Sequence, residues 1–361
     1  MHPPSSTLHA LFHPKTVAII GASSNPNKIS GLSLHYTKLN NYPGALYPVN
    51  PHRAEVQGVA TVPSIRDVPQ PVDLAFMAVP AAQVLAAAED CAAVGVKSLV
   101  VFSSGFAETS QEGIALQTRL TAIGQESGMR IVGPNCMGVL NIGLGLYGSF
   151  TRAFENGYPK VGGTGIVSQS GAFGAHGMTL ARERGLGLSL WVTTGNECDV
   201  DTADCLDFLA DDPGTQVILA YLEGAKNAAR LGAALEKCRL ARKPVVMLKV
   251  GRTELGAQAA ASHTASLAGS DAVWDAFFAD YGVVRANSIH ELIEIAYACS
   301  AGLFPQSRKV GLVTISGGVG VLMADAAIEA GLEVPEMPLD AQQRLLELVP
   351  FASPRNPVDT T

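Results

Sequence analysis

Short apolar runs alternate along the chain with longer stretches whose apolar residues recur every three or four positions. In the first third of the chain, five such runs each end in a turn: TVAIIGAS (16–23), ALYPVNP (45–51), LAFMAVP (74–80), SLVVFSS (98–104) and RIVGPN (130–135). Continuous apolar runs of this length are typical of strands that are buried on both faces of a parallel sheet. The intervening stretches, such as AAQVLAAAEDCAAVG (81–95), have helical periodicity and end in glycine. The pattern predicts a doubly wound, Rossmann-like α/β domain over residues 1–145.

A second series of the same kind follows the glycine-rich stretch YPKVGGTG. Its apolar runs are TGIVSQS (164–170), LSLWVTT (188–194), TQVILAYLE (215–223) and KPVVMLKVG (243–251). We expect helices to begin near Gly171, Val200 and Asn227, because helical periodicity starts there. These features predict a second α/β domain of flavodoxin-like type over residues 146–302, with a mostly parallel sheet.

Residues 303–361 open a third unit of the same design. The run KVGLVTISGGVGVLMADAAIEAG (309–331) reads as strand, turn and helix, and LDAQQRLLELVP (339–350) reads as a second helix before the tail FASPRNPVDTT. One strand and two helices cannot close a sheet that is covered on both faces. We therefore expect this unit to be truncated, with its remaining strands supplied by the rest of a longer protein.

Composition supports a folded α/β protein and excludes several classes. Hydrophobic residues make up 47% of the 361 positions, and 37 glycines suit many tight turns. The net charge of -7, without a basic block, argues against binding to nucleic acid. The six cysteines lack zinc-ligand spacing, so we expect reduced thiols and no metal site. No window of about 18 apolar residues is present, and we expect a cytoplasmic protein that does not enter the membrane.

The turn after the first strand is a candidate anion site. Gly21, Ala22 and Ser23 lead through Lys28 into a helix, and backbone N–H groups at such a turn bind phosphate, with Lys28 as a possible partner. A purely structural turn remains the alternative. The Gly-x-Gly-x-x-Gly pattern of dinucleotide dehydrogenases is absent, which argues against a nicotinamide-dependent oxidoreductase.

The ends of the other strands in this first series carry small, polar and turn-forming residues. Ligands of doubly wound sheets lie at the carboxyl ends of the strands, so these residues are expected to share one crevice. Strand termination alone would also explain them. The candidate residues are Asn50, Pro51, Val79, Pro80, Ser103, Ser104, Gly105 and Asn135.

A second anion cradle is predicted where IVSQSGAFG meets a helix, because Ser170 and Gly171 stand at the start of that helix. Glu223 ends a strand of the same domain and could hold an imidazole in one tautomer. Three further acidic residues, Glu197, Asp199 and Asp201, fit helix capping as well as a ligand role.

His263 lies in ASHTASLAGSD (261–271), among small residues and without a neighbouring metal ligand. A lone histidine in a loop is most often only solvated or hydrogen-bonded, and we assign that state to the other seven histidines. The small neighbours of His263 leave room for a bulky group to approach it. Together with two anion cradles, they make a phosphoryl group carried on the imidazole chemically coherent.

The blocks VAIIGAS, YPVNP, AVPA, FSSGFAE, GPNCMGVLN, VSQSGAFG, TTGNECDVD, YLEG and SHTASLAGSD occur in one order over nearly the whole chain. In this order they resemble the ADP-forming (NDP-forming) acyl-CoA synthetases, whose α-type portion is similar to the α subunit of succinyl-CoA synthetase. The resemblance implies that residues 1–145 bind coenzyme A, that the second domain carries a phosphohistidine, and that the third unit begins a further ligase domain.

The resemblance also implies a reaction in which acid, CoA and ATP give acyl-CoA, ADP and phosphate through an acyl phosphate and a phosphorylated histidine. His263 matches that histidine, Glu223 matches the glutamate that orients it, and Ser170 and Gly171 match the phosphate cradle. The turn with Lys28 and the later strand ends match the CoA site. The ATP-grasp region that binds ATP or ADP with Mg²⁺ in this family has no counterpart here, which implies a fused domain or a separate β subunit and an oligomeric enzyme.

One rival within the same resemblance is a CoA-sensing regulatory module of the kind fused to protein lysine acetyltransferases, in which the carrier histidine is often lost. Retention of His263, Glu223 and the Ser-Gly cradle favours the enzyme. The sequence does not select the small carboxylic acid, and acetate, propionate, branched and aryl acids all stay open.

Overall fold

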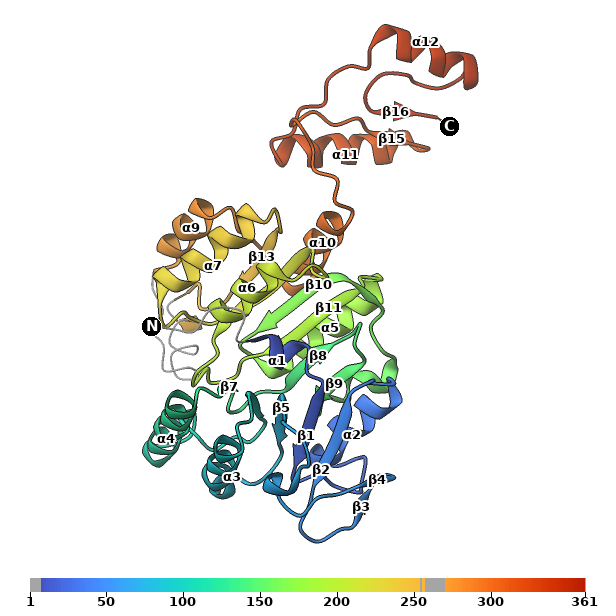
Figure 1. Cartoon of the computed structure of the whole chain (residues 1–361). Coiled ribbons are helices and arrows are strands. Elements are labelled where there is room, and N and C mark those ends of the chain that lie inside the picture. Colours follow the sequence, from blue (N-terminus) through green and yellow to red (C-terminus); the bar gives the residue numbers. More distant parts are fainter. Residues whose placement is uncertain (1–7, 254, 257–269, 361) are drawn as a thin grey trace. The chain divides into compact units, whose positions relative to one another are not determined.

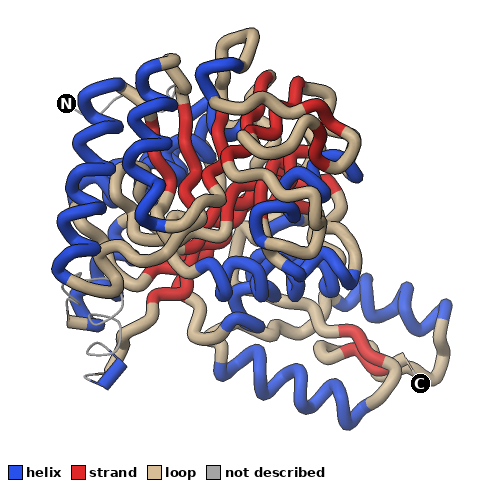
Figure 2. Tube along the Cα trace, turned by 90° about the horizontal axis from the view of Figure 1, so that it is seen from below, coloured by secondary structure: helices blue, strands red, loops and turns tan. Residues whose placement is uncertain are grey.

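The computed structural model describes residues 8–253, 255–256 and 270–360 of the chain, which forms two units, Met1–Ala301 and Gly302–Thr361. The first unit contains the two large sheets. In Figure 1 its five-stranded sheet runs through the blue and teal elements, and its seven-stranded sheet runs through the green and yellow elements. Figure 2 shows the strands of this unit gathered inside, with helices around them.

The five-stranded sheet has the order β2-β1-β5-β6-β7, and every neighbouring pair is parallel. All five predicted runs form its strands: β1 (Thr16–Ile20), β2 (Ala45–Val49), β5 (Leu74–Met77), β6 (Ser98–Val101) and β7 (Arg130–Val132). The connecting helices are α2 (Ile29–Leu39), α3 (Ala81–Ala93) and α4 (Gln111–Ser127). Helix α4 begins where Ser110 Oγ accepts the Gly113 N–H at 3.1 Å and ends at the left-handed Gly128. The predicted Rossmann-like sheet is confirmed.

The seven-stranded sheet has the order β14-β13-β12-β10-β11-β8-β9. Its predicted strands are β10 (Val161–Ser168), β11 (Leu188–Thr193), β12 (Val217–Leu222) and β13 (Val245–Lys249), extended by β14 (Val284–Arg285), and all of these pair in parallel. Its helices are α5 (Gly171–Arg184), α6 (Thr202–Asp211), α7 (Ala228–Leu240), α9 (Asp271–Asp280) and α10 (Ile289–Ser300). Three of them begin at or within two residues of the predicted starts.

Three strands of this sheet were not expected from the sequence, namely β14 and the two strands of a hairpin that precedes β10. β8 (Gly138–Asn141) and β9 (Leu146–Ser149) form a hairpin, and β8 pairs antiparallel with β11. The end of the expected first domain therefore supplies β8 to the second sheet, while the exact domain boundaries stay a prediction. Gly148 of this hairpin lies against Phe76 of β5, since a Cβ at Gly148 would stand 1.8 Å from the ring.

The remaining elements of the first unit are short. Helix α1 (His9–Phe12) precedes β1, and a small hairpin of β3 (Glu55–Val56) and β4 (Val59–Ala60) follows β2. Two 3₁₀ turns lie at Ile65–Asp67 and Arg152–Asn156.

The second unit contains α11 (Gly317–Glu329), α12 (Leu339–Leu348) and two short parallel strands, β15 (Val313–Thr314) and β16 (Val358–Asp359). The expectation of a single strand here was wrong, because the tail that reads as a loop contains β16. Apolar side chains of this unit are open to solvent, with Ile315 77% and Leu348 81% exposed. Such exposure suits a sheet that further strands would complete, which remains a prediction.

In the described part of the chain, none of the helices is both long and apolar enough to cross a membrane.

Candidate functional site

Each large sheet has a point where the connections leave adjacent strands in opposite directions. In the first sheet this point lies between β1, which leads to β2, and β5, which leads to β6 on the other side. In the second sheet it lies between β10, which leads to β11, and β12, which leads to β13. Loops at the carboxyl ends of such strand pairs diverge, which leaves a crevice for a ligand.

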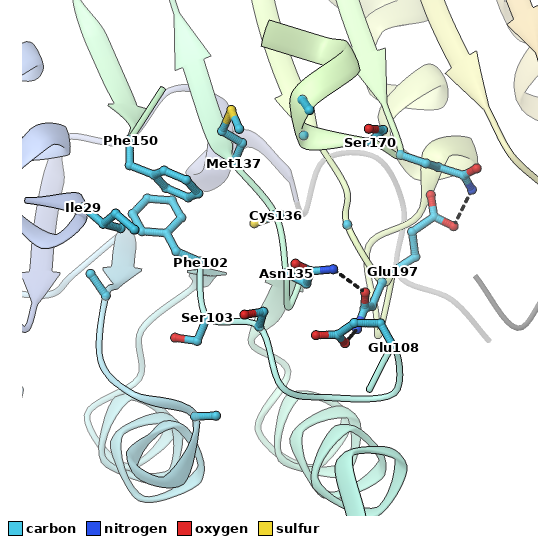
Figure 3. A pocket seen from close by; sticks show the side chains of 18 of the residues that line it. Ile29, Phe102, Ser103, Glu108, Asn135, Cys136, Met137, Phe150, Ser170 and Glu197 are labelled. Carbon is cyan, nitrogen blue, oxygen red and sulfur yellow. Dashed lines mark hydrogen bonds between the residues drawn. The ribbon is translucent and has the colours of Figure 1, made fainter. Parts of the chain in front are cut away.

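Both points open into one cavity of about 1160 Å³. Residues from the start of α2 and the ends of β5 and β6 line it on the side of the first sheet, and residues that follow β10, β11 and β12 line it on the side of the second. Figure 3 shows labelled side chains from both sides of this cavity. The two doubly wound halves of the first unit therefore share a single ligand-sized space.

Nine of the predicted site residues line this cavity. They are Lys28, Val79, Pro80, Ser103, Ser104, Asn135, Ser170, Gly171 and Glu223. Six others sit in the turns after the strands without lining it, namely Gly21, Ala22, Ser23, Asn50, Pro51 and Gly105. His263 lies outside the described residues.

The turn after β1 has a geometry that only glycine meets without strain. Gly21 has φ +82°, and a Cβ there would stand 2.8 Å from the carbonyl oxygen of Ala78. The Ala22 carbonyl accepts a 2.9 Å hydrogen bond from Asn50 Nδ2, which ties this turn to the end of β2. The chain then reaches Lys28, which is exposed, precedes α2 and lines the cavity. The turn thus places a cation and the start of a helix at one end of the cavity.

The ends of β6 and β7 are held together by polar contacts. Ser103 Oγ donates to the Val79 carbonyl at 2.5 Å, and the Asn135 N–H donates to the Ser103 carbonyl at 2.9 Å. Asn135 has φ +58°, in the left-handed region, where asparagine is one of the few tolerated side chains. These contacts hold three strand ends at a common edge of the cavity.

Glu108 joins the two halves of the cavity and was not singled out in the sequence. Its carboxylate accepts the Gly105 N–H at 2.6 Å and the Asn196 side-chain amide at 2.5 Å. Burial by itself raises the pKa of Glu108, but the hydrogen bonds from Asn196, Gly105 and Phe106 outweigh it and hold this pKa below its ordinary value. Glu108 is therefore a carboxylate that is stabilised in its ionised form.

One end of the cavity is apolar. Ile29, Phe102, Phe150 and Met137 lie together there in Figure 3, and the rings of Phe102 and Phe150 meet edge to face with centroids 5.2 Å apart. Sequence reasoning missed these residues, because a single apolar residue beside a strand end looks like any other core position. An apolar wall of this kind suits the aliphatic part of a long ligand.

The start of α5 forms the opposite, polar part of the cavity. Ser170 is the N-cap, and its Oγ accepts the Phe173 N–H at 3.3 Å. Gly171 and Ala172 follow in the first turn and line the cavity, where backbone amides have no acceptor within the helix. A Cβ at Gly171 would stand 3.1 Å from Cβ of Met137, so glycine keeps this approach open. The geometry is that of an anion site, to which the helix dipole also contributes.

Glu223 directly follows β12 and faces the same cavity. Its backbone N–H donates to Gln169 Oε1 at 2.6 Å. Gln169 is 9% exposed, immediately precedes Ser170 and also contacts the buried Glu197. The side chain that follows β10 is thus bonded to the backbone that follows β12, beside the start of α5.

The structure assigns different positions to Glu197, Asp199 and Asp201, for which the sequence allowed either helix capping or a ligand role. Asp201 caps α6 by accepting the Asp204 N–H at 2.9 Å, and Asp199 pairs with Arg130. Glu197 lines the cavity, is 5% exposed, and accepts hydrogen bonds from Thr194, from Thr202 and from Gln169. Burial, together with the nearby Asp201, raises the pKa of Glu197. Only Glu197 of the three reaches the candidate site.

The described residues on either side of the segment that carries His263 meet each other. Arg252 Nε lies 3.4 Å from Asp271 Oδ2, and Arg285 also pairs with Asp271. Lys249, the last residue of β13, is 1% exposed, and burial lowers its pKa. Arg252 and Asp271, which flank this segment in the sequence, therefore lie near the carboxyl ends of the strands of the second sheet, where Glu223 also lies.

Family models match three consecutive regions. A CoA binding domain matches residues 15–142, a succinyl-CoA ligase like flavodoxin domain matches residues 161–299, and a ligase-CoA domain matches residues 310–361. The first model spans all strands of the five-stranded sheet, and the second spans β10 to β14 of the seven-stranded sheet.

Characterised relatives match almost the whole chain. The α subunit of acetate–CoA ligase [ADP-forming] II from Pyrococcus furiosus is 38% identical over 98% of this chain and 76% of its own length. Acetate–CoA ligase [ADP-forming] I from Archaeoglobus fulgidus is 37% identical over 98% of this chain but only 50% of its own length. The chain thus spans three quarters of the separate subunit and half of the longer relative.

A solved structure agrees with this likeness. The dinucleotide forming acetyl-coenzyme A synthetase 1 of Candidatus Korarchaeum cryptofilum, in complex with phosphate and ADP, superposes with a TM-score of 0.92 at 36% identity, over 98% of this chain and 75% of that one. The relatives named are all ligases or ligase subunits, so the comparisons lend no support to a regulatory module. The expected family is confirmed: the chain belongs to the ADP-forming acyl-CoA synthetases and corresponds to the α subunit of the relatives that have separate subunits.

Proposed function

We propose that this chain is the CoA-binding and phosphoryl-carrying part of an enzyme that converts a small carboxylic acid, CoA and ATP into acyl-CoA, ADP and phosphate. The observation that carries the proposal is the single cavity that both sheets share. It brings strand ends suited to CoA and a helix start suited to phosphate within reach of one ligand. Acyl transfer between a thiol and a phosphate needs this proximity.

The residues of the first sheet fit CoA. Lys28 and the start of α2 would contact phosphate groups of the nucleotide, and the strand ends with Val79, Ser103 and Asn135 would line the path of the pantetheine. The apolar wall of Ile29, Phe102 and Phe150 gives its aliphatic segments a dry surface. Bound CoA supplies a thiol that attacks the acyl carbonyl.

The start of α5 fits the phosphate that leaves in that step. When the sulfur forms its bond to the carbonyl carbon, the bond to the phosphate oxygen breaks and phosphate departs with its negative charge. The Gly171 and Ala172 amides and the Ser170 turn would hold this charge through the helix terminus. The acyl phosphate itself would form when the acid attacks a phosphorylated His263, which breaks the phosphorus–nitrogen bond.

We propose that His263 carries the phosphoryl group and that Glu223 orients its imidazole. Neutral imidazole is nucleophilic near pH 7, and its phosphoramidate passes phosphate in either direction. Glu223 stands at the cavity beside the phosphate cradle, where a carboxylate can accept the N–H of an imidazole. ATP or ADP with Mg²⁺ would bind to an ATP-grasp domain or β subunit, in an oligomer located in the cytoplasm.

Two measurements test the proposal. Calorimetry of the chain alone should detect CoA binding, because the proposed CoA site lies wholly in the first unit. Incubation with ATP, Mg²⁺ and an ATP-grasp β subunit from an ADP-forming ligase should place one acid-labile, base-stable phosphate on the chain. The His263→Ala variant should lose this phosphate and still bind CoA.

His290→Ala is the matched control, because His290 is an exposed histidine on α10 and does not line the cavity. It should be phosphorylated like the unmodified chain. Label that persists in His263→Ala would refute the carrier assignment, and a chain without CoA affinity would refute the proposed site. A screen of acids with the assembled enzyme would then identify the substrate.

A further inference from the structure

The side-chain amide of Gln169 spans the gap between the phosphate cradle and Glu223. Its Oε1 accepts the backbone N–H of Glu223 at 2.6 Å and that of Gly224 at 3.2 Å. Its Nε2 donates to the Gly224 carbonyl at 2.8 Å and to Oε2 of Glu197 at 3.0 Å. An amide offers two N–H donors and two acceptor lone pairs, so every hydrogen-bonding position of this group is used.

The surroundings determine which way the Gln169 amide points. On one side, the backbone N–H groups of Glu223 and Gly224 need an acceptor, which only Oε1 can provide. On the other side, the Gly224 carbonyl and the Glu197 carboxylate need a donor, which only the NH₂ group can provide. If the amide were turned over, its NH₂ group would meet the two backbone N–H groups, and its oxygen would meet the carbonyl and the carboxylate. Because Gln169 is 9% exposed, water has little access to replace these bonds.

The side chain is not needed to hold its own strand in the sheet. The Gln169 backbone N–H already donates to the Tyr221 carbonyl at 3.2 Å, which continues the β10–β12 ladder. The amide adds contacts only to the turn at Glu223 and Gly224 and to Glu197. Its contribution is therefore local to the polar end of the cavity.

Glu197 forms the far anchor of this connection. Its Oε1 accepts the Thr202 N–H at 2.9 Å and the hydroxyl groups of Thr194 and Thr202, while its Oε2 receives Gln169. Glu197 also adopts φ +55°, which a non-glycine residue keeps only when its surroundings impose it. Lys226 donates to its carbonyl at 2.5 Å. Glu197 is thus held on several sides.

From these contacts we propose that Gln169 is a positioning residue, which sets the place of Glu223 relative to the start of α5. Gln169 is covalently joined to Ser170, so one residue connects the phosphate cradle at the start of α5 with Glu223, which follows β12. Displacement of a reacting group by about 1 Å can cost on the order of 100-fold in rate. The inference rests on the proposed role of Glu223 in phosphoryl transfer.

The structural half of this inference is measured on the chain alone. In Gln169→Leu, the Glu223 and Gly224 amide protons lose their acceptor, and their hydrogen exchange should accelerate at least tenfold in amide NMR spectra. Gln216→Leu is the matched control, because Gln216 is an exposed residue just before β12, at the opposite edge of the same sheet. Unchanged exchange at Glu223 and Gly224 in Gln169→Leu would overturn the proposal.

The functional half uses the chain with an ATP-grasp β subunit. Gln169→Leu and Gln169→Glu should each slow phosphorylation of the chain by ATP at least tenfold, while the Kd for CoA stays within about twofold. Gln169→Glu places a carboxylate against the Gly224 carbonyl and Glu197. The double variant Gln169→Glu/Glu197→Gln restores a hydrogen-bond donor between the two side chains and should recover part of the lost phosphorylation rate.

A residue that only stabilised the fold would give a different set of results. Its loss would weaken CoA binding and phosphorylation together, and the double variant Gln169→Glu/Glu197→Gln would not recover the phosphorylation rate. Either of these two results overturns the inference. Glu223→Gln, measured in parallel, separates this inference from the proposed function. Normal phosphorylation of Glu223→Gln would refute the proposed role of Glu223, whereas slow Glu223→Gln with normal Gln169 variants would refute only the positioning role.

Discussion

Arg130 and Asp199 form a buried ion pair that joins the two sheets of the first unit. Arg130 begins β7 of the five-stranded sheet, Asp199 follows β11 of the seven-stranded sheet, and Nε lies 2.9 Å from Oδ2. Their side chains are 5% and 13% exposed, and Arg130 also reaches Asp204 at 3.1 Å. The Asp199 carboxylate accepts the Ile131 N–H at 2.8 Å as well. The pair is therefore one of the contacts that hold together the halves that flank the cavity.

Arg130→Met should lower the free energy of unfolding of the first unit by about 3–5 kcal/mol, because it leaves the carboxylate of Asp199 without its cation, while Asp204 keeps its pair with Arg230. Urea denaturation checks this value. The control is Arg119→Met, which breaks exposed pairs with Glu89 and Glu126 and should cost less than about 1 kcal/mol. Equal losses in the two variants would contradict the structural role given to Arg130.

Gly21→Ala should destabilise the chain and weaken CoA binding, because the new Cβ meets the Ala78 carbonyl oxygen in addition to requiring a left-handed backbone. Gly128→Ala separates these two costs. Gly128 has φ +76° but nothing within 4 Å of the added Cβ, so it should lose only about 1–2 kcal/mol. Thermal unfolding and CoA calorimetry measure both. If Gly21→Ala lost no more stability than Gly128→Ala, the close approach of the Ala78 carbonyl to Gly21 would have no energetic effect.

Lys28→Ala should weaken CoA binding about two- to fivefold, the range expected for an exposed charge pair worth up to about 1 kcal/mol. The difference should shrink in concentrated salt, which screens exposed charges. Lys160→Ala removes an exposed lysine just before β10, outside the cavity lining, and should leave the Kd unchanged. Identical Kd values for both variants at low salt would remove Lys28 from the proposed site.

The lowered pKa of Glu108 predicts that the free energy of unfolding depends on pH. Its pKa is lower in the folded chain than in the unfolded chain, because the hydrogen bonds from Asn196 and the backbone amides outweigh its burial. The folded state thus gains stability above the unfolded pKa of about 4.3 and loses it as the pH falls through the folded value.

Glu108→Gln should remove that contribution, so the difference in stability between the two proteins should be largest near pH 7 and shrink below about pH 4. Glu55→Gln serves as the control, since Glu55 is an exposed glutamate on β3. Urea midpoints measured from pH 3 to pH 8 test this. A difference between Glu108→Gln and the unmodified chain that does not vary with pH would refute the assignment.

The fold was predictable wherever burial on both faces left a continuous apolar run, as in β1 and β12. The strands that were missed are short or carry few apolar residues. The hairpin of β8 and β9 has the glycines Gly138 and Gly148 inside it, and β16 follows Pro357. These segments become strands because a neighbouring strand forms hydrogen bonds with them, and the local pattern of apolar residues does not show which strand that will be.

The candidate site divides in the same way. Residues such as Lys28, Ser170, Gly171 and Glu223 stand directly at strand or helix ends, so the rule that ligands gather at such ends places them together. Phe150, Met137 and Gln169 carry no such signal, because their part in the cavity depends on which distant segment faces them. Glu108 and Asn196, 88 positions apart, meet only after both sheets have formed.

By itself the sequence determined two doubly wound sheets, the glycine-containing turn that follows the first strand of each series, and the family to which the chain belongs, because apolar periodicity, turn chemistry and motif order are local properties. Only the tertiary structure decided that both switch points open into one cavity and that Gln169 connects β10 with Glu223. Those relations depend on how the sheets pack and on hydrogen bonds between distant segments. Such bonds form where burial removes water from both partners, and that burial exists only once the chain has folded.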